Sequence, residues 1–235
     1  MEKRFRFFEL IMAVFVTVLV VSNIASSAKI VDLGLQLFGV PLAFDAGTLL
    51  FPLSYIFGDI LTEVYGYQRS RKVIWTGFAC LALTSAVFWV VSVLPGEATW
   101  LGYAGQTAYL AILGGVSSGG IVLGSLAGYW GGEFTNSVVL AKLKVLTRGR
   151  HLWLRTISST LVGELVDTLA FVVVASLFQV FPWSLFLTLT VSNYLFKCAV
   201  EALMTPVTYL VVNGLKRAEG EDFYDRETDF NPFAV

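Results

Sequence analysis

Six ionisable residues interrupt segments of the sequence that are otherwise almost entirely apolar. Five are acidic and one is basic: Asp59, Glu63, Glu164, Asp167, Lys197 and Glu201. A charged side chain in apolar surroundings is costly unless it faces an opposite charge, water or a ligand. Because one lysine cannot neutralise five carboxylates, some of the carboxyl groups must be protonated or solvated. The residue types therefore predict an interior polar site.

The spacing of these residues places them on three helical faces, since residues three or four apart share a face of an α-helix. The faces comprise Thr48, Pro52, Tyr55, Asp59 and Glu63; then Thr160, Glu164, Asp167, Thr168 and Phe171; and finally Thr190, Asn193, Lys197, Glu201 and Thr205. Three polar stripes on three helices predict one shared cavity. The alternative is structural ion pairing, chiefly of Lys197 with Asp167 or Glu164.

The composition indicates a membrane protein. Of the 235 residues, 56% are hydrophobic and only 14% are charged, whereas soluble domains carry about 25% charged residues. The mean hydropathy is +0.74. Two cysteines and one histidine give no metal-ligand cluster, so we expect neither a metal nor a cofactor.

Six segments have the roughly 20 apolar residues that a membrane-spanning helix needs. They are Phe8–Ala28, Ala43–Tyr65, Val73–Leu94, Tyr109–Gly132, Thr156–Val180 and Ser184–Val212. All but Lys29 and Lys197 of the 16 Lys and Arg residues fall on one side of this arrangement. The excess of positive charge on the cytoplasmic side predicts that both termini are cytoplasmic. We expect an all-α transmembrane domain over residues 1–215 and an acidic cytoplasmic tail with little structure of its own over residues 216–235.

Depth along the spans ranks the candidate site residues. Asp167 and Lys197 fall near the midplane with Tyr55 at a similar depth, and Asp59 lies deeper toward the cytoplasm. Glu63 and Glu201 approach the inner interface, and Asn23 adds a polar position in the outer half of the first span. Glu133 follows the fourth span at its cytoplasmic end, and we expect it to lie outside the site.

Two further patterns concern helix packing. Gly120, Gly124, Gly128 and Gly132 repeat every four residues in the fourth span, which favours close packing within the bundle or across a homodimer. The segments "FGDILTEV" and "VGELVDTL" each place two carboxylates after a glycine, in spans that run in opposite directions. This echo is consistent with an inverted three-plus-three repeat.

Four separated motifs resemble the bacterial queuosine precursor transporter family, which formerly carried only a domain-of-unknown-function label. They are "FPLSYIFGDILTEVYGYQRSRK", "RTISSTLVGELVDTLAF", "NYLFKCAVEALMTPVTYLV" and "DRETDFNPF". The resemblance extends from Ser22 to Phe233. It implies a six-helix bacterial inner-membrane importer of 7-deazaguanines for the queuosine modification of tRNA. It also implies kinship with the substrate-binding subunits of vitamin uptake transporters, but without a required ATPase module.

A 7-deazaguanine suits the predicted cavity. Its ring N–H and exocyclic amino group form a planar pair of donors that one carboxylate can accept in a bidentate manner, and Asp167 is the carboxylate we expect to do so. Phe51 or Tyr55 can stack on the flat ring. Asn23 or Asn193 can read the carbonyl group. We expect the partners to be this small molecule and the lipid bilayer, and we expect no nucleic acid partner.

Three other functions compete with a solo carrier. The first is a substrate-binding subunit of an ATP-driven vitamin uptake system. The second is an intramembrane aspartyl protease, but the GxGD motif of those enzymes is absent because the corresponding residues are Ile56-Phe57-Gly58-Asp59. The third is a channel, but five carboxylates and a lysine within the spans fit a gated binding site better than an open pore. We therefore expect a transporter and not an enzyme.

Overall fold

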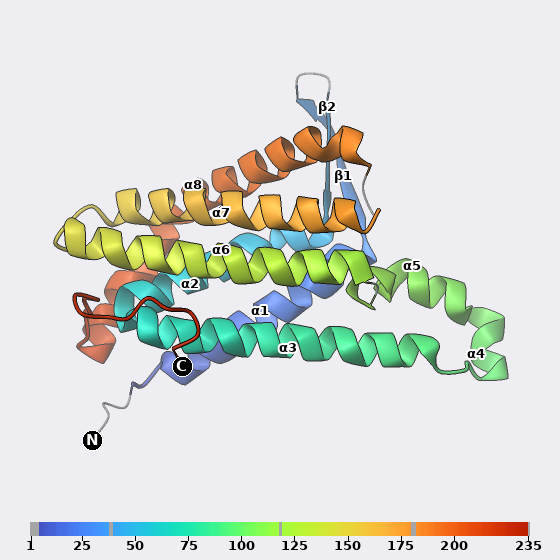
Figure 1. The fold of residues 1–235 in the computed structure, drawn as a ribbon, viewed down its shortest axis with the longest axis horizontal. Helices are drawn as coiled ribbons and strands as arrows, with labels where there is room; N and C mark the ends of the chain where they lie inside the picture. The colour runs from blue at the N-terminus through green and yellow to red at the C-terminus, as the bar shows by residue number, and fades with distance from the viewer. Residues whose placement is uncertain (1–4, 38–39, 118, 180–181, 235) are drawn as a thin grey trace.

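The computed structural model describes residues 5–37, 40–117, 119–179 and 182–234 as a helical bundle with one short hairpin (Figure 1). Its elements, in chain order, are α1 (Phe8–Ala28), β1 (Ile30–Leu37), β2 (Val40–Asp45), a 3-10 turn (Ala46–Leu49), α2 (Phe51–Tyr65), α3 (Tyr67–Val93), α4 (Ala98–Tyr103), α5 (Gly105–Ser117), α6 (Gly119–Leu146), α7 (Leu152–Leu177), a second 3-10 turn (Trp183–Leu185) and α8 (Phe186–Glu219).

Five helical segments of the described chain are long and apolar enough to cross a membrane. They are Phe8–Ala28, Tyr67–Val93, Gly105–Leu146, Leu152–Leu177 and Leu189–Glu219. They correspond to the first, third, fourth, fifth and sixth predicted spans, although Val180, the predicted end of the fifth, lies outside the described residues. Large apolar side chains such as Leu83, Leu203 and Leu210 are more than half exposed on these helices, as lipid-facing residues are.

The second predicted span, Ala43–Tyr65, is wrong over residues 43–50. The helix starts only at Phe51 and has 15 residues, about 22 Å at about 1.5 Å per residue, which is short of the roughly 30 Å hydrocarbon core. Pro52 stands in the first helical turn, where its missing N–H is tolerated and the residue before it is disfavoured in a helix. The preceding residues instead form β2, paired antiparallel with β1 from Ile30↔Asp45 to Leu37↔Val40. The all-α prediction therefore does not include this hairpin.

Helix α2 occupies the interior of the bundle, in contact with α1, α3, α6 and α8. All but three of its residues are buried, including the charged Asp59 and Glu63. The central position of a short helix that carries two carboxylates makes α2 the element around which the polar site is arranged.

Helices α6 and α7 run antiparallel side by side and form the most extensive helix–helix contact (Figure 1). A Cβ atom on Gly124 would lie 3.0 Å from the carbonyl oxygen of Phe171, and one on Gly128 would lie 2.9 Å from that of Asp167. These glycines therefore allow the two backbones to approach closely. The glycine repeat of the fourth span serves packing within the bundle at these positions.

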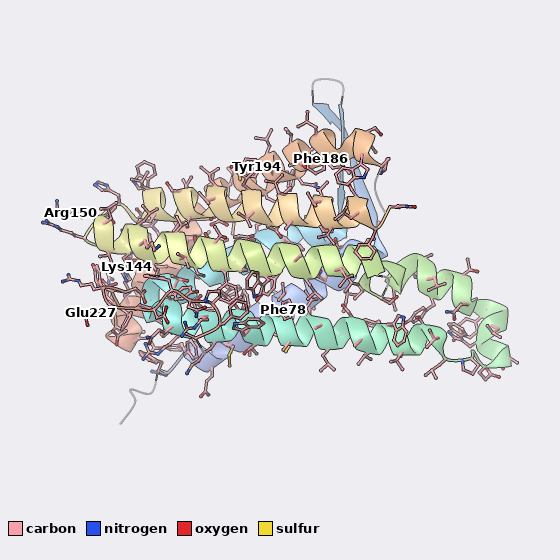
Figure 2. All side chains as sticks on the ribbon, in the orientation of Figure 1. Phe78, Lys144, Arg150, Phe186, Tyr194 and Glu227 are labelled. Atoms are coloured by element: carbon pink, nitrogen blue, oxygen red, sulfur yellow. The ribbon has the colours of Figure 1, made fainter. Side chains whose placement is uncertain are left out.

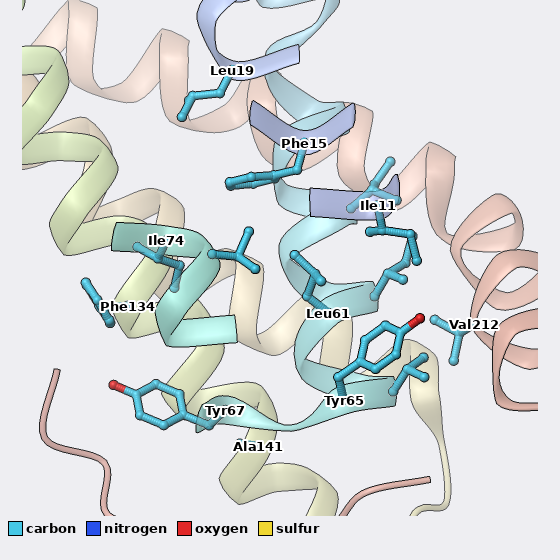
Figure 3. Packing of buried hydrophobic residues seen from close by; sticks show 14 of the residues in the cluster. Ile11, Phe15, Leu19, Leu61, Tyr65, Tyr67, Ile74, Phe134, Ala141 and Val212 are labelled. Atoms are coloured by element: carbon cyan, nitrogen blue, oxygen red, sulfur yellow. The ribbon is translucent and has the colours of Figure 1, made fainter. Parts of the chain in front are cut away.

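We call the end of the bundle where α1 begins and α8 ends the terminal end (Figure 1). The apolar core lies toward this end, and Figure 3 shows how its side chains pack. The backbone N–H of Phe7 donates to Glu219 Oε1 at 2.7 Å there, which joins the two helix ends. Buried side chains from six helices meet in this core: Ile11, Phe15, Leu19, Leu61, Tyr65, Ile74, Ala141, Leu152 and Val212 among them.

Residues 220–234 form neither helix nor strand, yet they pack on the terminal end. Both carboxylate oxygens of Asp225 accept the backbone N–H of Tyr67, the first residue of α3, at 3.1 Å. Arg71 donates to the carbonyl oxygen of Asn231 at 2.7 Å, and the Trp75 indole N–H donates to that of Pro232 at 2.8 Å. The sequence predicted a tail with little structure of its own and did not predict this attachment; Val235 lies outside the described residues.

Candidate functional site

A buried cluster of polar side chains lies between α2, α6, α7 and α8, and we call it the polar cluster. It consists of Tyr55, Asp59, Glu133, Asn136, Thr160, Glu164, Asp167, Thr168, Lys197 and Glu201. All of them except Lys197 are buried, and the Lys197 side chain is 18% exposed. Residues from each of the three predicted stripes therefore meet in one buried cluster, and α6 adds a fourth helix to it.

Lys197 links α8 to α7 through two carboxylates. Its ammonium group donates to Asp167 and lies 3.0 Å from Glu164 Oε2. The same ammonium lies 5.1 Å from the centre of the Phe51 ring, within the range of a cation–π contact. The predicted ion pair between the fifth and sixth spans is confirmed, and Phe51 lies at the edge of the cluster.

Asp59 and Asn136 link α2 to α6. The Asn136 amide donates to Asp59 Oδ1 at 2.8 Å, and both residues have no exposed surface. Asn136 was not predicted as a site residue. Its signal in the sequence is its position three residues after Glu133, which puts both on one face of α6.

Glu133 is fully buried in the centre of the cluster, contrary to the prediction that it lies outside the site at the cytoplasmic end. The prediction failed because α6 does not end at Gly132 but continues to Leu146. Glu133 faces Gly58, where a Cβ atom would lie 2.6 Å from its Oε2. Its electrostatic neighbours are Asp59, Glu164, Asp167 and Glu201.

Glu63 lies outside the polar cluster, in a separate group of charges at the terminal end. Its Oε1 lies 2.7 Å from Arg155 of α7, 2.6 Å from Lys216 of α8 and 3.7 Å from Lys144 of α6. Glu63, Lys144 and Arg155 are at most 1% exposed. Three cations hold its carboxylate, so Glu63 joins α2, α6, α7 and α8 outside the polar cluster.

The tail joins this Glu63 network through Asp222. Lys144 and Lys216 lie 2.5 and 2.8 Å from Asp222 Oδ1. Partial burial opposes its ionisation, but the hydrogen bonds from the two lysines outweigh it and hold the pKa of Asp222 below its ordinary value. Charged side chains, among them Lys144, Arg150 and Glu227, gather at this end of the bundle (Figure 2). The terminal end is therefore closed by paired charges.

Two predicted site residues have no described contact with the polar cluster. The Asn23 amide donates within α1 to the carbonyl oxygen of Leu19 at 2.9 Å. Asn193 is exposed on α8, although Thr190, Lys197 and Glu201 of the same predicted stripe are buried or partly buried. Neither is positioned as the amide that reads a ligand in this conformation.

Many polar atoms of the cluster have no hydrogen-bond partner among the described residues. They are the Tyr55 hydroxyl, Asp59 Oδ2, both carboxylate oxygens of Glu133 and Glu201, Asn136 Oδ1 and the hydroxyls of Thr160 and Thr168. An unmade hydrogen bond on a buried polar group costs about 1–3 kcal/mol. Most of these atoms are acceptors, so the cluster is suited to a ligand rich in N–H donors.

Comparison with known families decides which class of protein carries this cluster. The family model described as "Putative vitamin uptake transporter" matches residues 45–211, a range that contains the whole polar cluster. The chain belongs to the vitamin uptake transporter family. With its apolar helices, this makes it a multi-pass membrane protein and a transporter, which excludes the intramembrane protease.

The chain has curated relatives in three bacteria. It is 31% identical over 176 residues to the "Probable queuosine precursor transporter" of Bacillus subtilis (strain 168), covering 74% of this chain and 73% of that protein. A protein of the same name from Haemophilus influenzae is 26% identical over 171 residues, 71% and 67% of the two chains. The "Queuosine precursor transporter" of Escherichia coli (strain K12) is 25% identical over 152 residues, 65% and 63% of the two chains. No solved structure matches the chain.

Proposed function

We propose that this protein imports queuosine precursors for the queuosine modification of tRNA. The substrates are 7-deazaguanines, such as the 7-cyano or 7-aminomethyl base, or queuine. The observation that carries the proposal is the buried, acceptor-rich polar cluster between α2, α6, α7 and α8, in a chain whose relatives are named queuosine precursor transporters.

The chemistry of the ligand matches the cluster. A 7-deazaguanine presents a ring N–H and an amino group on one edge, a pyrrole N–H on another, and a carbonyl oxygen. Carboxylates accept the donors, the ring of Tyr55 or Phe51 stacks on the flat base, and Lys197 donates to the carbonyl oxygen. Asp59, Glu164, Asp167, Thr168 and Glu201 complete the proposed binding site.

The proposed topology has six crossings in the bacterial inner membrane, with both termini cytoplasmic. Helix α2 is the short crossing, completed on its outer side by the hairpin. The basic residues of the Glu63 network, Lys144, Arg155 and Lys216, support a cytoplasmic terminal end. A homodimer through the glycine-rich fourth span is also part of the proposal, and the open space beside Gly119 in that span supports it.

An inverted repeat of α1–α3 and α5–α8 fits the positions of the two echoed motifs. Gly58 of the first motif packs against Glu133, and Gly163 of the second packs against Asn136, so both glycines lie against one face of α6. Each motif then continues into cluster carboxylates, Asp59 in α2 and Glu164 with Asp167 in α7. Related motifs in opposite orientation around a central site are typical of transporters built from inverted repeats.

The proposed mechanism is alternating access. The Glu63 network and the packed tail close the cytoplasmic side, so release of substrate to the cytoplasm requires these ion pairs to separate. Lys197 between Asp167 and Glu164 couples the ligand to α7 and α8, because a bound base competes for the same carboxylates. We favour facilitated import with trapping by later metabolism over proton symport and over dependence on an ATPase module.

The test is complementation in cells that lack their own importer and cannot make the base. Each candidate base is supplied separately at low concentration, and queuosine in tRNA is measured. We expect this chain to restore the modification with at least one base in a host without any vitamin-uptake ATPase module. A membrane-inserted protein that restores it with none of the bases would refute the proposed function.

A further inference from the structure

We propose that Glu133, which packs against Gly58 of α2, accepts hydrogen bonds from the amino-bearing edge of the base with its two carboxylate oxygens. The Oδ1 atom of Asn136 lies on the same face of α6 and is the third acceptor. The inference rests on the proposed function and names the residues that would give it specificity. Neither residue belongs to the three polar stripes on α2, α7 and α8. The contact that the sequence assigned to Asp167 is proposed for Glu133 instead, because Lys197 already engages Asp167.

Glu133 differs from the neighbouring carboxylates in what its oxygens already do. Asp167 and Glu164 are engaged by Lys197, and Asp59 has one oxygen occupied by Asn136. Both oxygens of Glu133 have no hydrogen-bond partner among the described residues, and the side chain has no exposed surface. A free pair of coplanar acceptors is what a ring N–H and an adjacent amino group require.

Glu201 also has two buried oxygens without a partner in the described chain, but its surroundings differ. Glu133 has close neighbours: Gly58 lies against its carboxylate, and the preceding residue, Gly132, lies against the Tyr55 hydroxyl. A Cβ atom at Gly132 would lie 2.5 Å from that hydroxyl oxygen. The Tyr55 hydroxyl therefore lies beside the residue that precedes Glu133, and the buried Tyr55 ring, 2% exposed, is close enough to this part of α6 to contact a base bound to Glu133.

Asn136 gives the site its third acceptor. Its amide nitrogen donates to Asp59, which leaves its Oδ1 without a donor among the described residues. Because Glu133 and Asn136 lie three residues apart, they present their acceptors on one face of α6. Three acceptors on one helix face select ligands with several N–H donors, and they select against bases that lack the amino group.

The experiment measures binding of two ligands to purified protein in detergent: 7-cyano-7-deazaguanine and its analogue without the 2-amino group. We expect the wild-type protein to bind the amino-bearing base about tenfold or more tightly, because the analogue leaves a buried acceptor unpaired. Glu133→Gln should weaken binding of the amino-bearing base by about tenfold or more and remove most of the discrimination. Glu133→Asp keeps the carboxylate but places it one methylene group closer to the backbone of α6. This variant should show an intermediate preference for the amino-bearing base.

Glu201→Gln is the matched control, since it removes the other buried carboxylate with two unpartnered oxygens. We expect it to change the affinity for both ligands by similar factors and to keep the preference. If Glu133→Gln, or Glu133→Asp where the glutamine variant does not fold, keeps the wild-type preference, the inference is wrong and the proposed function stands. If the wild-type protein binds no 7-deazaguanine at all, the proposed function itself fails.

Discussion

At the scale of single residues, the polar cluster combines one satisfied ion-pair system with a set of unsatisfied acceptors. Lys197 is shared between Asp167 and Glu164, whereas the carboxylate oxygens of Glu133 and Glu201 have no hydrogen-bond partner in the described chain. Buried ion pairs seldom add much net stability, but breaking one leaves an uncompensated charge. The contrast separates residues that hold the helices together from residues that are free to take a ligand.

Replacing Lys197 with methionine should therefore destabilise the protein through the carboxylates it leaves behind. We expect a loss of about 3–5 kcal/mol, measured as a fall in the midpoint of thermal unfolding in detergent. The double variant Lys197→Met with Asp167→Asn should recover part of that loss, because it removes one of the two stranded charges.

Lys72→Met serves as the control for this pair, since Lys72 is exposed on α3. It should leave the unfolding midpoint almost unchanged. A Lys197→Met protein as stable as the wild type would mean that the carboxylates of α7 are neutral without the lysine, and the ion pair would then have no structural role.

At the scale of elements, the tail supplies what the start of α3 lacks. The residue before that helix, Gly66, has a φ of +85° and contributes no side-chain cap. Asp225 replaces the cap from 158 positions further along the chain by accepting the Tyr67 N–H. A carboxylate at a helix N-terminus also interacts favourably with the helix dipole, so the tail is part of the folded bundle.

Removal of this cap should have a measurable cost. We expect Asp225→Ala to lower the free energy of unfolding by about 0.5–2 kcal/mol and truncation after Gly220 to lower it further, because Phe223 and Asp222 are then lost from the terminal end as well. Thermal unfolding of each purified variant measures both effects. Glu227→Gln, an exposed change in the same tail, is the matched control; equal stability of the truncated and full-length proteins would contradict the capping role.

At the scale of the whole molecule, the sequence was sufficient for features that repeat along one helix. Apolar length located the five long helices, and helical spacing placed Tyr55, Asp59, Glu164, Asp167 and Glu201 on buried faces. The Lys197 ion pair also followed, because a single cation among carboxylates has few alternatives.

Features that depend on where one element meets another could not be predicted in the same way. The charge of Glu133 marked the end of an apolar stretch, so the predicted fourth span ended at Gly132 and left Glu133 out, although α6 continues to Leu146. Glu63 was assigned to the site from its stripe, but its position beside Arg155 and Lys216 depends on the tilt of three helices. The attachment of Asp225 to Tyr67 joins distant segments without any local pattern.

The proposed orientation of the whole bundle rests on the difference between its two ends. The turn between α6 and α7 lies at the terminal end with the basic residues, whereas α4 lies at the opposite end of α3 (Figure 1). Basic residues are retained on the cytoplasmic side, so the α6–α7 turn should face the cytoplasm and α4 should face outward. Single cysteines at exposed positions of each end, Arg150→Cys and Tyr103→Cys, in a background without Cys80 and Cys198, test this directly. A membrane-impermeant thiol reagent should label Tyr103→Cys in intact cells and Arg150→Cys only after lysis; the reverse pattern would invert the proposed direction in which the Glu63 network opens.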